Sequence, residues 1–479
     1  MLRLTQPDSI QPYLRDASQF SGRAEGVAFP ENEKEVVDFL KEANAQKIPV
    51  TVSGGRTGLV GGAVPEGGWV LSTEKFSRLL EIKKDPAGKN SWARSEPGIL
   101  LKEFRGTVEK QGLFYPPDPT GPKAFFGGTL ATNASGPNSF KYGGTRRHIQ
   151  RIRVALADGT VLDLRRGEIR AHREGMLEFP AVRKIRVPLP QYEMPKIKSA
   201  AGLFAAPGMD AVDLFIGSEG TLGVITEIEA ALIPRPSSVL SFVVFFPTEE
   251  TSWRFARKVR DENRGARTLE YFDAGSLEFL RPRFSSIPKE AKACLFIEEE
   301  ILGTGPAAIE KWHRLFEEES ALDQIWEGDT PAKQEEFRRF RSELPLAVKD
   351  FLAEHGQVKI GTDTSVPAAR FEELMLFHRR EVEKLGLANV TFGHIGESHV
   401  HLNLLPRNNE EAERGRALYP RLVEKAEALG GVFSAEHGVG KLKRAYLLKH
   451  YGEKGIREMR AVKDALDPNG ILGPGNIFE

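Results

Sequence analysis

Near the start of the chain, apolar residues recur at helical spacing and then give way to a short apolar run. From Glu33 to Asn44 the apolar positions are three and four residues apart, as on one face of an amphipathic helix. Asn32, with Glu35 three residues further on, is a plausible N-cap for this helix. The run at 48–52 predicts a strand, and the glycine-rich segment SGGRTGLVGG at 53–62 follows it directly. A strand that ends in such a loop is suited to phosphate binding.

The rest of the chain alternates strand-like runs with helical stretches. Further strands are predicted at 68–72, 152–157, 160–164 and 224–232. Pro234 and Pro236 interrupt the pattern, and a new apolar run begins at residue 239. Beyond them the pattern predicts strands at 239–246, 293–298 and 399–405, and helices at 250–263, 306–320, 367–384 and 409–429. We therefore predict an α+β fold whose second part is an antiparallel sheet covered by helices.

The length of the chain requires more than one domain. Its 479 residues are too many for a single hydrophobic core. We place a boundary near residue 236 and predict domains at 1–236 and 237–425. We expect the C-terminal segment 426–479 to return to the first domain.

Composition narrows the possible functions. Lys plus Arg (67) equals Asp plus Glu (67), so the chain as a whole has no field that would attract nucleic acid or an anionic membrane. No signal peptide and no run of eighteen apolar residues is found, so we expect a cytoplasmic location, with peripheral attachment at the inner membrane left open. Cys294 is the single cysteine, which excludes an in-chain disulfide or iron–sulfur cluster, and we expect it to be buried.

Three separate glycine-rich segments indicate one extended ligand. They lie at 53–62, at 125–136 (FFGGTLATNASG) and at 217–227 (GSEGTLGVITE). Small residues let backbone N–H groups approach a pyrophosphate closely. Taken alone, the first segment matches neither the dinucleotide fingerprint nor a Walker A sequence, and such turns are more often plain loops. The occurrence of three together favours a cofactor.

These segments resemble the FAD-binding half of the FAD-linked oxidases of the vanillyl-alcohol oxidase type. The resemblance implies a FAD-binding domain of the PCMH type, a substrate (cap) domain and FAD between them. Carried over by position, it implies FAD contacts from Ser53, Gly54, Gly55, Arg56, Thr57, Gly58, Pro117, Asp118, Gly128, Thr129, Thr132, Asn133, Gly136, Tyr142, Gly143, Glu219, Gly220, Val224 and Ile225. The Arg56 guanidinium is expected to add a charged contact to the pyrophosphate. The first segment holds no histidine or cysteine that could tether flavin and His148 is the nearest conceivable tether, so we expect non-covalent FAD.

Four of the ten histidines fall within residues 394–437. In the predicted strand HVHLNL at 399–404, strict alternation places His399, His401 and Asn403 on one face and three apolar residues on the other. A solvated edge strand would show the same alternation. His394 just before the strand and the pair Glu436–His437 add imidazole and carboxylate groups, the ligand set of Zn or Mn. An open catalytic metal site is therefore the alternative to the edge strand.

The segments GHIGESHVHLN (393–403) and SAEHGVGKLKR (434–444) are similar to those of the metal-bearing subgroup of these flavoenzymes, the D-2-hydroxyglutarate and D-lactate dehydrogenases. The similarity implies that His394, His401 and Glu436 ligate the metal, that Asn403 bonds the substrate and that His437 is the base. It gives His399 no role. The subgroup's C-terminal pattern appears here as DPNGILGPGN (467–476), where Gly473 and Asn476 depart, so a lysine near the flavin is not expected from it.

A 2-hydroxy acid also needs a cation for its carboxylate. By the same similarity, FRRFRSELP (337–345) points to Arg341, with Arg338 and Arg339 as rivals. Three arginines in this stretch are also what a solvated helix face would show. The hydroxyglutarate enzymes carry a lysine where this chain has Gly361, which makes 2-hydroxyglutarate doubtful unless Lys359 takes that part.

The resemblance as a whole implies a FAD-dependent, metal-assisted dehydrogenase that oxidises a D-2-hydroxy acid, of lactate or glycolate size or larger, to the 2-oxo acid. The electron acceptor is external: a quinone, a cytochrome, an electron-transferring flavoprotein or oxygen. Two rivals stay open at this point. One is a non-redox flavoenzyme resembling alkylglycerone-phosphate synthase, and the other is a subunit of a complex resembling glycolate oxidase.

Overall fold

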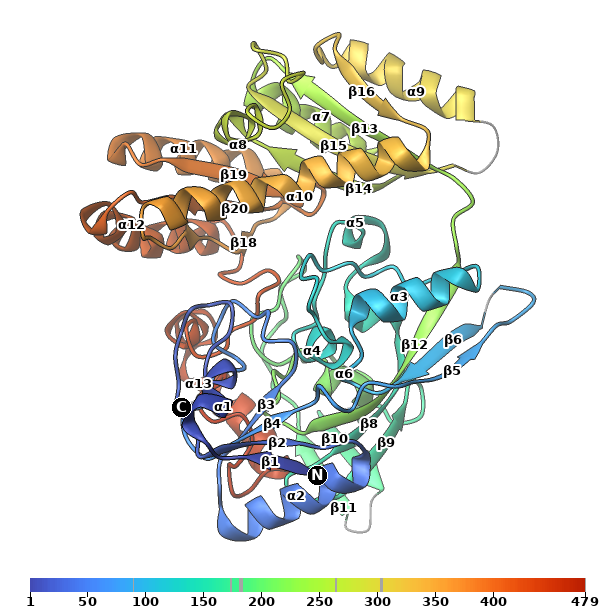
Figure 1. Cartoon of the computed structure of the whole chain (residues 1–479), viewed down its shortest axis with the longest axis vertical. Coiled ribbons are helices and arrows are strands. Elements are labelled where there is room, and N and C mark those ends of the chain that lie inside the picture. Colours follow the sequence, from blue (N-terminus) through green and yellow to red (C-terminus); the bar gives the residue numbers. More distant parts are fainter. Residues whose placement is uncertain (89, 173–174, 181–183, 263–264, 302–304, 479) are drawn as a thin grey trace.

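The computed structural model describes residues 1–88, 90–172, 175–180, 184–262, 265–301 and 305–478. Figure 1 shows two lobes, one above the other, with both chain termini in the lower one. We call the upper lobe the cap lobe (residues 239–431) and the lower lobe the base lobe (residues 1–234 and 438–478). The chain crosses between the lobes at 235–238 and again at 432–437. No helix among the described residues is long and apolar enough to span a membrane.

The first sheet of the base lobe carries the start of the chain. Its strands β1 (Leu2–Leu4), β2 (Gly26–Phe29), β4 (Trp69–Ser72) and β3 (Val50–Ser53) lie in that order, with β2 and β3 parallel to β4. Helix α2 (Glu33–Gln46) buries Val36 and Leu40 against this sheet. The side chain of Asn32 caps it by accepting a hydrogen bond from the Glu35 N–H at 3.0 Å. The predicted helix and the strand that follows it are both present.

The second sheet of the base lobe is antiparallel. It consists of β5 (Leu79–Lys83), β6 (Ser91–Ser95), β12 (Val224–Pro234), β8 (Ile149–Ala155) and β9 (Val161–Arg165), and β7 (Leu113–Phe114) also pairs with β12. The helices α3 (Leu101–Lys110), α4 (Phe126–Ala131) and α6 (Ala211–Phe215) contribute to its core. The hairpin β10 (Met176–Pro180) and β11 (Lys184–Pro188) lies beside α13 (Arg444–Leu466), which brings the C-terminus back into this lobe.

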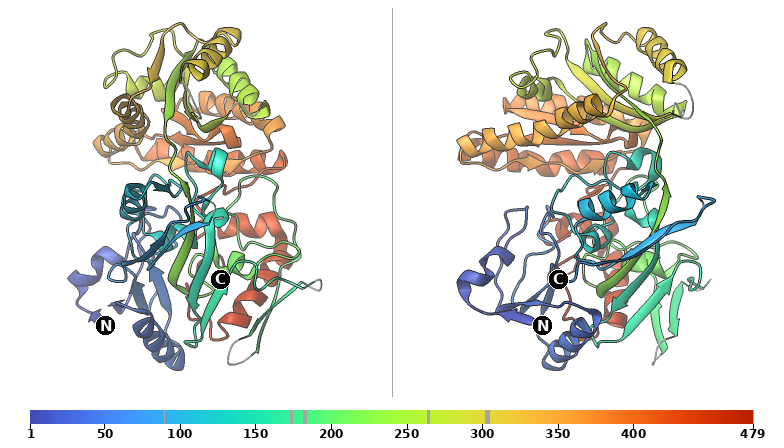
Figure 2. Two further views of the ribbon diagram at one scale, coloured as in Figure 1. Left: turned by 90° about the vertical axis from the view of Figure 1, so that its right-hand side faces the viewer. Right: turned by 45° about the vertical axis from the view of Figure 1, so that its right-hand side comes forward.

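The cap lobe is built on one antiparallel sheet. Its strands run in the order β16 (Ile325–Gly328), β13 (Val239–Phe246), β15 (Ala293–Glu300), β14 (Ala266–Phe272), β19 (Asn389–Gly393), β20 (His399–Leu404) and β17 (Ile360–Gly361), and β18 (Thr364–Ser365) also pairs with β20. Its helices are α7 (Glu249–Asp261), α8 (Ala274–Leu280), α9 (Gly305–Glu318), α10 (Pro331–Glu354), α11 (Phe371–Leu385) and α12 (Asn409–Ala428). Helices lie on both faces of the sheet (Figure 2).

Burial on both faces explains the unbroken apolar run of β13. Phe242 and Val244 enter a cluster with α7, α9 and α11, whereas Val243 and Phe245 enter a second cluster with α8 and α10. The predicted strand at 239–246 is found with these bounds. The predicted helix at 367–384 begins instead at Phe371, because a short 3-10 turn follows Pro367. The last residue of the helix predicted at 250–263 lies outside the described residues.

Candidate functional site

The three glycine-rich segments meet around one cavity in the base lobe. The space between protein atoms there amounts to about 1470 Å³, part of which is open solvent. Each segment holds one non-glycine residue with a left-handed backbone: Arg56 (φ 55°), Asn133 (φ 48°) and Glu219 (φ 52°). Such conformations cost free energy and cluster at ligand-binding loops. In the first loop a Cβ on Gly55 would lie 1.9 Å from the carbonyl oxygen of Lys123, so only glycine fits there.

Most of the residues assigned to FAD by resemblance line this cavity. They are Gly54, Gly55, Arg56, Thr57, Gly58, Gly128, Thr129, Thr132, Glu219, Gly220 and Ile225. Eight others do not belong to its lining: Ser53, Pro117, Asp118, Asn133, Gly136, Tyr142, Gly143 and Val224. Thr73 and Ser135 line the cavity although the sequence did not single them out.

Several of the eight have other partners. Tyr142 donates its hydroxyl hydrogen bond to Glu300 of the cap lobe at 2.6 Å, and Asp118 forms an ion pair with Arg105. His148, the conceivable tether, does not line the cavity, and its Nε2 lies 3.0 Å from the Tyr142 carbonyl oxygen. Burial lowers the pKa of His148 to about 4. The Arg56 guanidinium stacks over the Tyr13 ring at 4.4 Å while lining the cavity.

The C-terminal segment locks the third glycine-rich segment in place. The carboxylate of Glu219 accepts hydrogen bonds from the N–H groups of Val439 and Gly440, each at 2.7 Å. Asn476, one of the departures from the family pattern, donates to the carbonyl oxygens of Gly62 and Glu219. The same side chain accepts a hydrogen bond from Lys441 at 2.5 Å. The Asn476 side chain therefore connects the first and the third glycine-rich segments, because it binds a backbone carbonyl of each.

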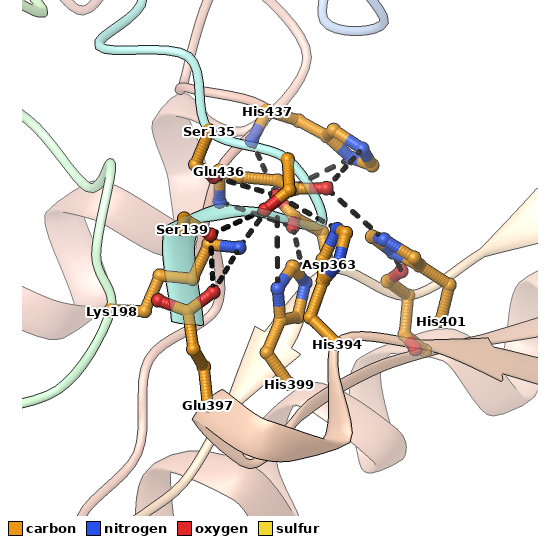
Figure 3. A network of polar contacts seen from close by, with 12 residues as sticks. Ser135, Ser139, Lys198, Asp363, His394, Glu397, His399, His401, Glu436 and His437 are labelled. Atoms are coloured by element: carbon orange, nitrogen blue, oxygen red, sulfur yellow. Dashed lines mark hydrogen bonds and ion pairs between the residues drawn. The ribbon is translucent and has the colours of Figure 1, made fainter. Parts of the chain in front are cut away.

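Glu436 and His437 line the cavity. Figure 3 shows that they also lie beside His394, His399 and His401, which form a histidine cluster. Oε1 of Glu436 lies 3.2 Å from Nε2 of His401, and Oε2 lies 3.3 Å from Nε2 of His394. The ligand atoms of His394, His399, His401 and Glu436 all lie within 4.8 Å of one another. A second group with the same property consists of Asp363, His401, Glu436 and His437. The structure thus brings together the three residues expected to ligate a metal.

The outer nitrogens of two of these rings face hydrogen-bond acceptors. Nδ1 of His394 lies 2.6 Å from Oε1 of Glu270, and Nδ1 of His401 lies 3.1 Å from the carbonyl oxygen of Thr362. An acceptor there favours a proton on Nδ1, so that Nε2, the nitrogen nearer Glu436, is the one that could ligate a cation. Metal-binding histidines typically donate their other ring N–H to such an acceptor. The imidazole and carboxylate donors therefore fit a divalent cation of the Zn or Mn type.

Asp363 supports the turn that carries Glu436 and His437. It is fully buried, and its carboxylate accepts hydrogen bonds from the N–H groups of both residues, at 3.2 and 2.9 Å. The Lys443 ammonium and the Ser434 hydroxyl also donate to it, each at 2.8 Å. Burial alone would raise the pKa of Asp363, but His437 and Lys443 hold it well below its usual range. The carboxylate is therefore charged beneath the site.

Lys198 joins the base lobe to this cluster. Its ammonium lies 2.8 Å from Oε2 of Glu436 and 3.0 Å from Oε2 of Glu397, and Glu397 also accepts from the Ser139 hydroxyl. Burial alone would lower the pKa of Lys198, but the two carboxylates raise it. Sequence reasoning missed Lys198 because nothing in the pattern around it distinguishes it from a surface lysine.

The arginine expected to bind the substrate carboxylate has a protein partner. Nε and Nη2 of Arg341 both lie 2.8 Å from Oε2 of Glu270, the carboxylate that also holds His394. Although burial would raise its pKa, His394 and Arg341 lower the pKa of Glu270 to about 2. Of the two rivals, Arg338 pairs with Glu298, and Arg339 lies over the Phe284 ring.

Asn403 lies outside the cavity lining. Its Nδ2 donates to the carbonyl oxygen of His401 at 3.0 Å, and its Oδ1 is buried without a hydrogen-bond partner in the described residues. Lys359, named as a substitute for the missing lysine, is not among the cavity-lining residues either. Cys294 is buried in the cap lobe with its thiol free, as expected.

Comparison with known proteins agrees with this geometry. A model of the FAD-binding domain matches residues 24–165, and a model of the C-terminal domain of FAD-linked oxidases matches residues 235–477. The chain is 30% identical to the glycolate oxidase subunit GlcD of Bacillus subtilis (strain 168), covering 97% of this chain and 92% of that protein. It is also 30% identical to D-lactate dehydrogenase of Anaerostipes hadrus, covering 98% and 92%.

A solved structure shares the fold. Alkyldihydroxyacetonephosphate synthase superposes with a TM-score of 0.69 at 18% identity, covering 98% of this chain and 82% of that chain. At this identity the likeness concerns the fold alone. The two domain models and the relatives of nearly equal length show that the chain belongs to the FAD-linked oxidases and is related to the D-2-hydroxy acid dehydrogenases.

Proposed function

We propose that this protein is a FAD-dependent, metal-assisted dehydrogenase that oxidises a D-2-hydroxy acid to the 2-oxo acid. One observation carries the proposal: Glu436 and His437 line the cavity assigned to FAD and also belong to the histidine cluster. A small substrate at this wall would contact a flavin, a metal and a base together. The two relatives are named as a D-lactate dehydrogenase and a glycolate oxidase subunit. These names support a 2-hydroxy acid of the size of lactate or glycolate as the substrate.

The glycine-rich loops are proposed to hold FAD without a covalent bond. The first loop, from Gly54 to Gly58, would take the pyrophosphate, and Arg56 would add a positive charge beside it. The other two segments would lie along the rest of the cofactor. Bound FAD supplies the hydride acceptor. Eight assigned residues do not line the cavity, and we propose that they support the FAD-binding loops: Ser53, Pro117, Asp118, Asn133, Gly136, Tyr142, Gly143 and Val224.

His394, His401 and Glu436 are proposed to hold the metal. A bound divalent cation polarises the substrate hydroxyl. Glu270 and the Thr362 carbonyl orient the two rings, and Arg341 holds Glu270 in turn. Nη1 of Arg341 is proposed to bind the substrate carboxylate, since Nε and Nη2 already contact Glu270. Asn403 is proposed to bond the substrate through its unpartnered Oδ1.

His437 is proposed to take the proton of the substrate hydroxyl. Its Nδ1 lies 3.4 Å from Oδ2 of Asp363. Burial lowers the pKa of His437 although the Asp363 carboxylate opposes this effect. The Nε2 of the ring is proposed to accept the proton. The Asp363 carboxylate then stabilises the imidazolium that forms, as an acid residue does behind other catalytic histidines.

Anaerobic reduction of the flavin tests the function directly. The purified yellow protein is mixed with D- and L-2-hydroxy acids, with and without a chelator, and the visible flavin band is followed. We expect bleaching by one enantiomer, abolished by the chelator. A yellow protein that no hydroxy acid reduces would contradict the redox function and favour the alkylglycerone-phosphate synthase type of chemistry. Bleaching that survives chelation would remove the metal from the mechanism.

Gly128→Leu is expected to prevent FAD binding without unfolding the protein. Gly128 lines the cavity within helix α4, and a Cβ there would meet no protein atom within 4 Å. A leucine side chain would therefore occupy space assigned to the cofactor. Gly106→Leu is the matched control, since Gly106 lies in helix α3 with equally open space and is exposed. Flavin content after purification and the thermal unfolding midpoint are measured. Normal flavin content in Gly128→Leu would refute the cofactor position.

His394→Ala and His401→Ala are each expected to lose the metal while retaining FAD. Each change removes one imidazole donor from the cluster. The other ring keeps its own acceptor, Glu270 for His394 or the Thr362 carbonyl for His401. Metal content is measured by elemental analysis and flavin content by absorbance. Full metal stoichiometry in both variants would rule out the ligand assignment.

A further inference from the structure

His399 is the one member of the histidine cluster for which the proposed function has no use. It lies at the start of β20, two residues before His401, and its side chain is 0% exposed. Its Nδ1 has no hydrogen-bond partner in the described part of the chain, and its Nε2 has only the Asp363 carboxylate beside it, at a distance of 3.2 Å. A buried imidazole nitrogen without a hydrogen-bond partner costs free energy. Its position therefore requires an explanation.

The ring nevertheless has the same surroundings as its two neighbours. Its Nε2 lies 3.2 Å from Oδ1 of Asp363, and its Nδ1 lies 3.9 Å from Oε2 of Glu436. One nitrogen thus faces a fixed acceptor, and the other faces the carboxylate at the centre of the cluster. The rings of His394 and His401 are arranged in the same way: Nδ1 lies beside an acceptor outside the cluster, and Nε2 lies beside Glu436.

The rings also converge. The His399 ring centroid is 5.4 Å from that of His394 and 4.6 Å from that of His401. The ligand atoms of all three rings and of Glu436 lie within 4.8 Å of one another. A single cation placed among them would supply the partner that His399 lacks, while Asp363 would hold the proton on its outer nitrogen.

We infer that His399 is a fourth protein ligand of the metal, so that the site is formed by three imidazoles and one carboxylate. The inference rests on the proposed metal site and goes beyond it by one ligand. Three imidazoles favour a nitrogen-binding transition ion such as Zn²⁺, Co²⁺ or Fe²⁺ over Mg²⁺ or Ca²⁺, which prefer oxygen. A 2-hydroxy acid would then reach a metal already held by four protein groups.

Cobalt binding to the FAD-loaded protein tests the inference. Co²⁺ affinity is measured by competition with a chelator, and the visible d–d spectrum is recorded for the natural protein and for His399→Asn. We expect the variant to bind Co²⁺ about 10-fold more weakly or worse, with a changed spectrum. His378→Asn is the matched control. His378 is also buried, 2% exposed, and neither of its ring nitrogens has a hydrogen-bond partner among the residues that the structure describes, but it lies in α11, outside the cluster. It is expected to leave both readouts unchanged.

Each remaining outcome has a defined meaning. Natural affinity and spectrum in His399→Asn, with metal lost in His394→Ala, would overturn the fourth ligand and leave the proposed function intact. If the natural protein binds no Co²⁺, the whole metal site is overturned. The anaerobic flavin reduction described above would then decide on its own whether the protein oxidises 2-hydroxy acids. If His399→Asn does not retain FAD, pulsed EPR of the Cu²⁺-loaded natural protein counts the bound imidazoles. Three bound imidazoles support the inference, and two overturn it.

Discussion

His437→Ala is expected to retain FAD and metal and to lower the rate of substrate oxidation by about 10²-fold or more, the usual range for a positioned acid–base group. The ring lines the cofactor cavity, stacks on His401 at 5.1 Å and has Asp363 behind its Nδ1. Alanine removes the proton acceptor but leaves the N–H bond from residue 437 to Asp363, which comes from the backbone. The turn that carries Glu436 should therefore persist.

Stopped-flow measurement of flavin reduction under anaerobic conditions separates this step from reoxidation. His450→Ala is a suitable control, because His450 pairs with Glu427 outside the cofactor cavity and the metal cluster. A reduction rate close to that of the natural protein would remove His437 from the mechanism. Loss of metal in His437→Ala would instead give the ring a ligand role, through the second group of four residues.

Asp363→Ala is expected to have the largest effect on stability, about 3–5 kcal/mol, the usual cost of breaking a buried ion pair from one side. Asp363 is 0% exposed, and the change leaves the buried Lys443 ammonium with the Ser434 hydroxyl but without a carboxylate. It also releases the backbone N–H groups of Glu436 and His437. We therefore expect loss of metal together with the loss of stability.

A double-mutant cycle isolates the ion pair. Lys443→Met removes the cation, and the double variant Asp363→Ala, Lys443→Met leaves no unpaired charge. Urea unfolding of the three variants and the natural protein, all without FAD, is expected to show the double variant more stable than Asp363→Ala alone. Equal stability of Asp363→Ala and the natural protein would show that the pair contributes nothing.

The alternation of β20 was the most informative local signal. It placed His399 and His401 on one face, and the structure buries Val400 and Leu402 in apolar clusters on the other. Strands β13 and β15 of the cap sheet could likewise be predicted, because a strand buried on both faces leaves an unbroken apolar run. The other strands of this sheet, β14 and β16 to β19, were not predicted. The start of α11 was misplaced by four residues, since the 3-10 turn after Pro367 has no distinct periodicity.

The acidic partners of the site could not be predicted from local pattern. Glu270 lies 124 residues before His394, and Lys198 lies 199 residues before Glu397. Only the folded sheet and the crossing segment bring them together. For the same reason Arg341 was assigned to the substrate alone, whereas the fold sets it against Glu270. The glycine-rich segments were located correctly, but which of their residues face the cavity depends on turns such as the left-handed one at Asn133.

Because the C-terminal segment returns to the base lobe, we expect this lobe to depart from the usual order of folding during synthesis, in which the N-terminal domain folds first. Buried residues of the two cap clusters all fall between positions 240 and 429, so the cap lobe is a continuous stretch of chain. The base core, in contrast, includes Leu447 and Met459, and Val50 of β3 donates its N–H to Ile471. Domains generally fold in the order in which they emerge from the ribosome. We therefore expect the first lobe to emerge to be the last to be completed, and cofactor binding to require residues 438–478.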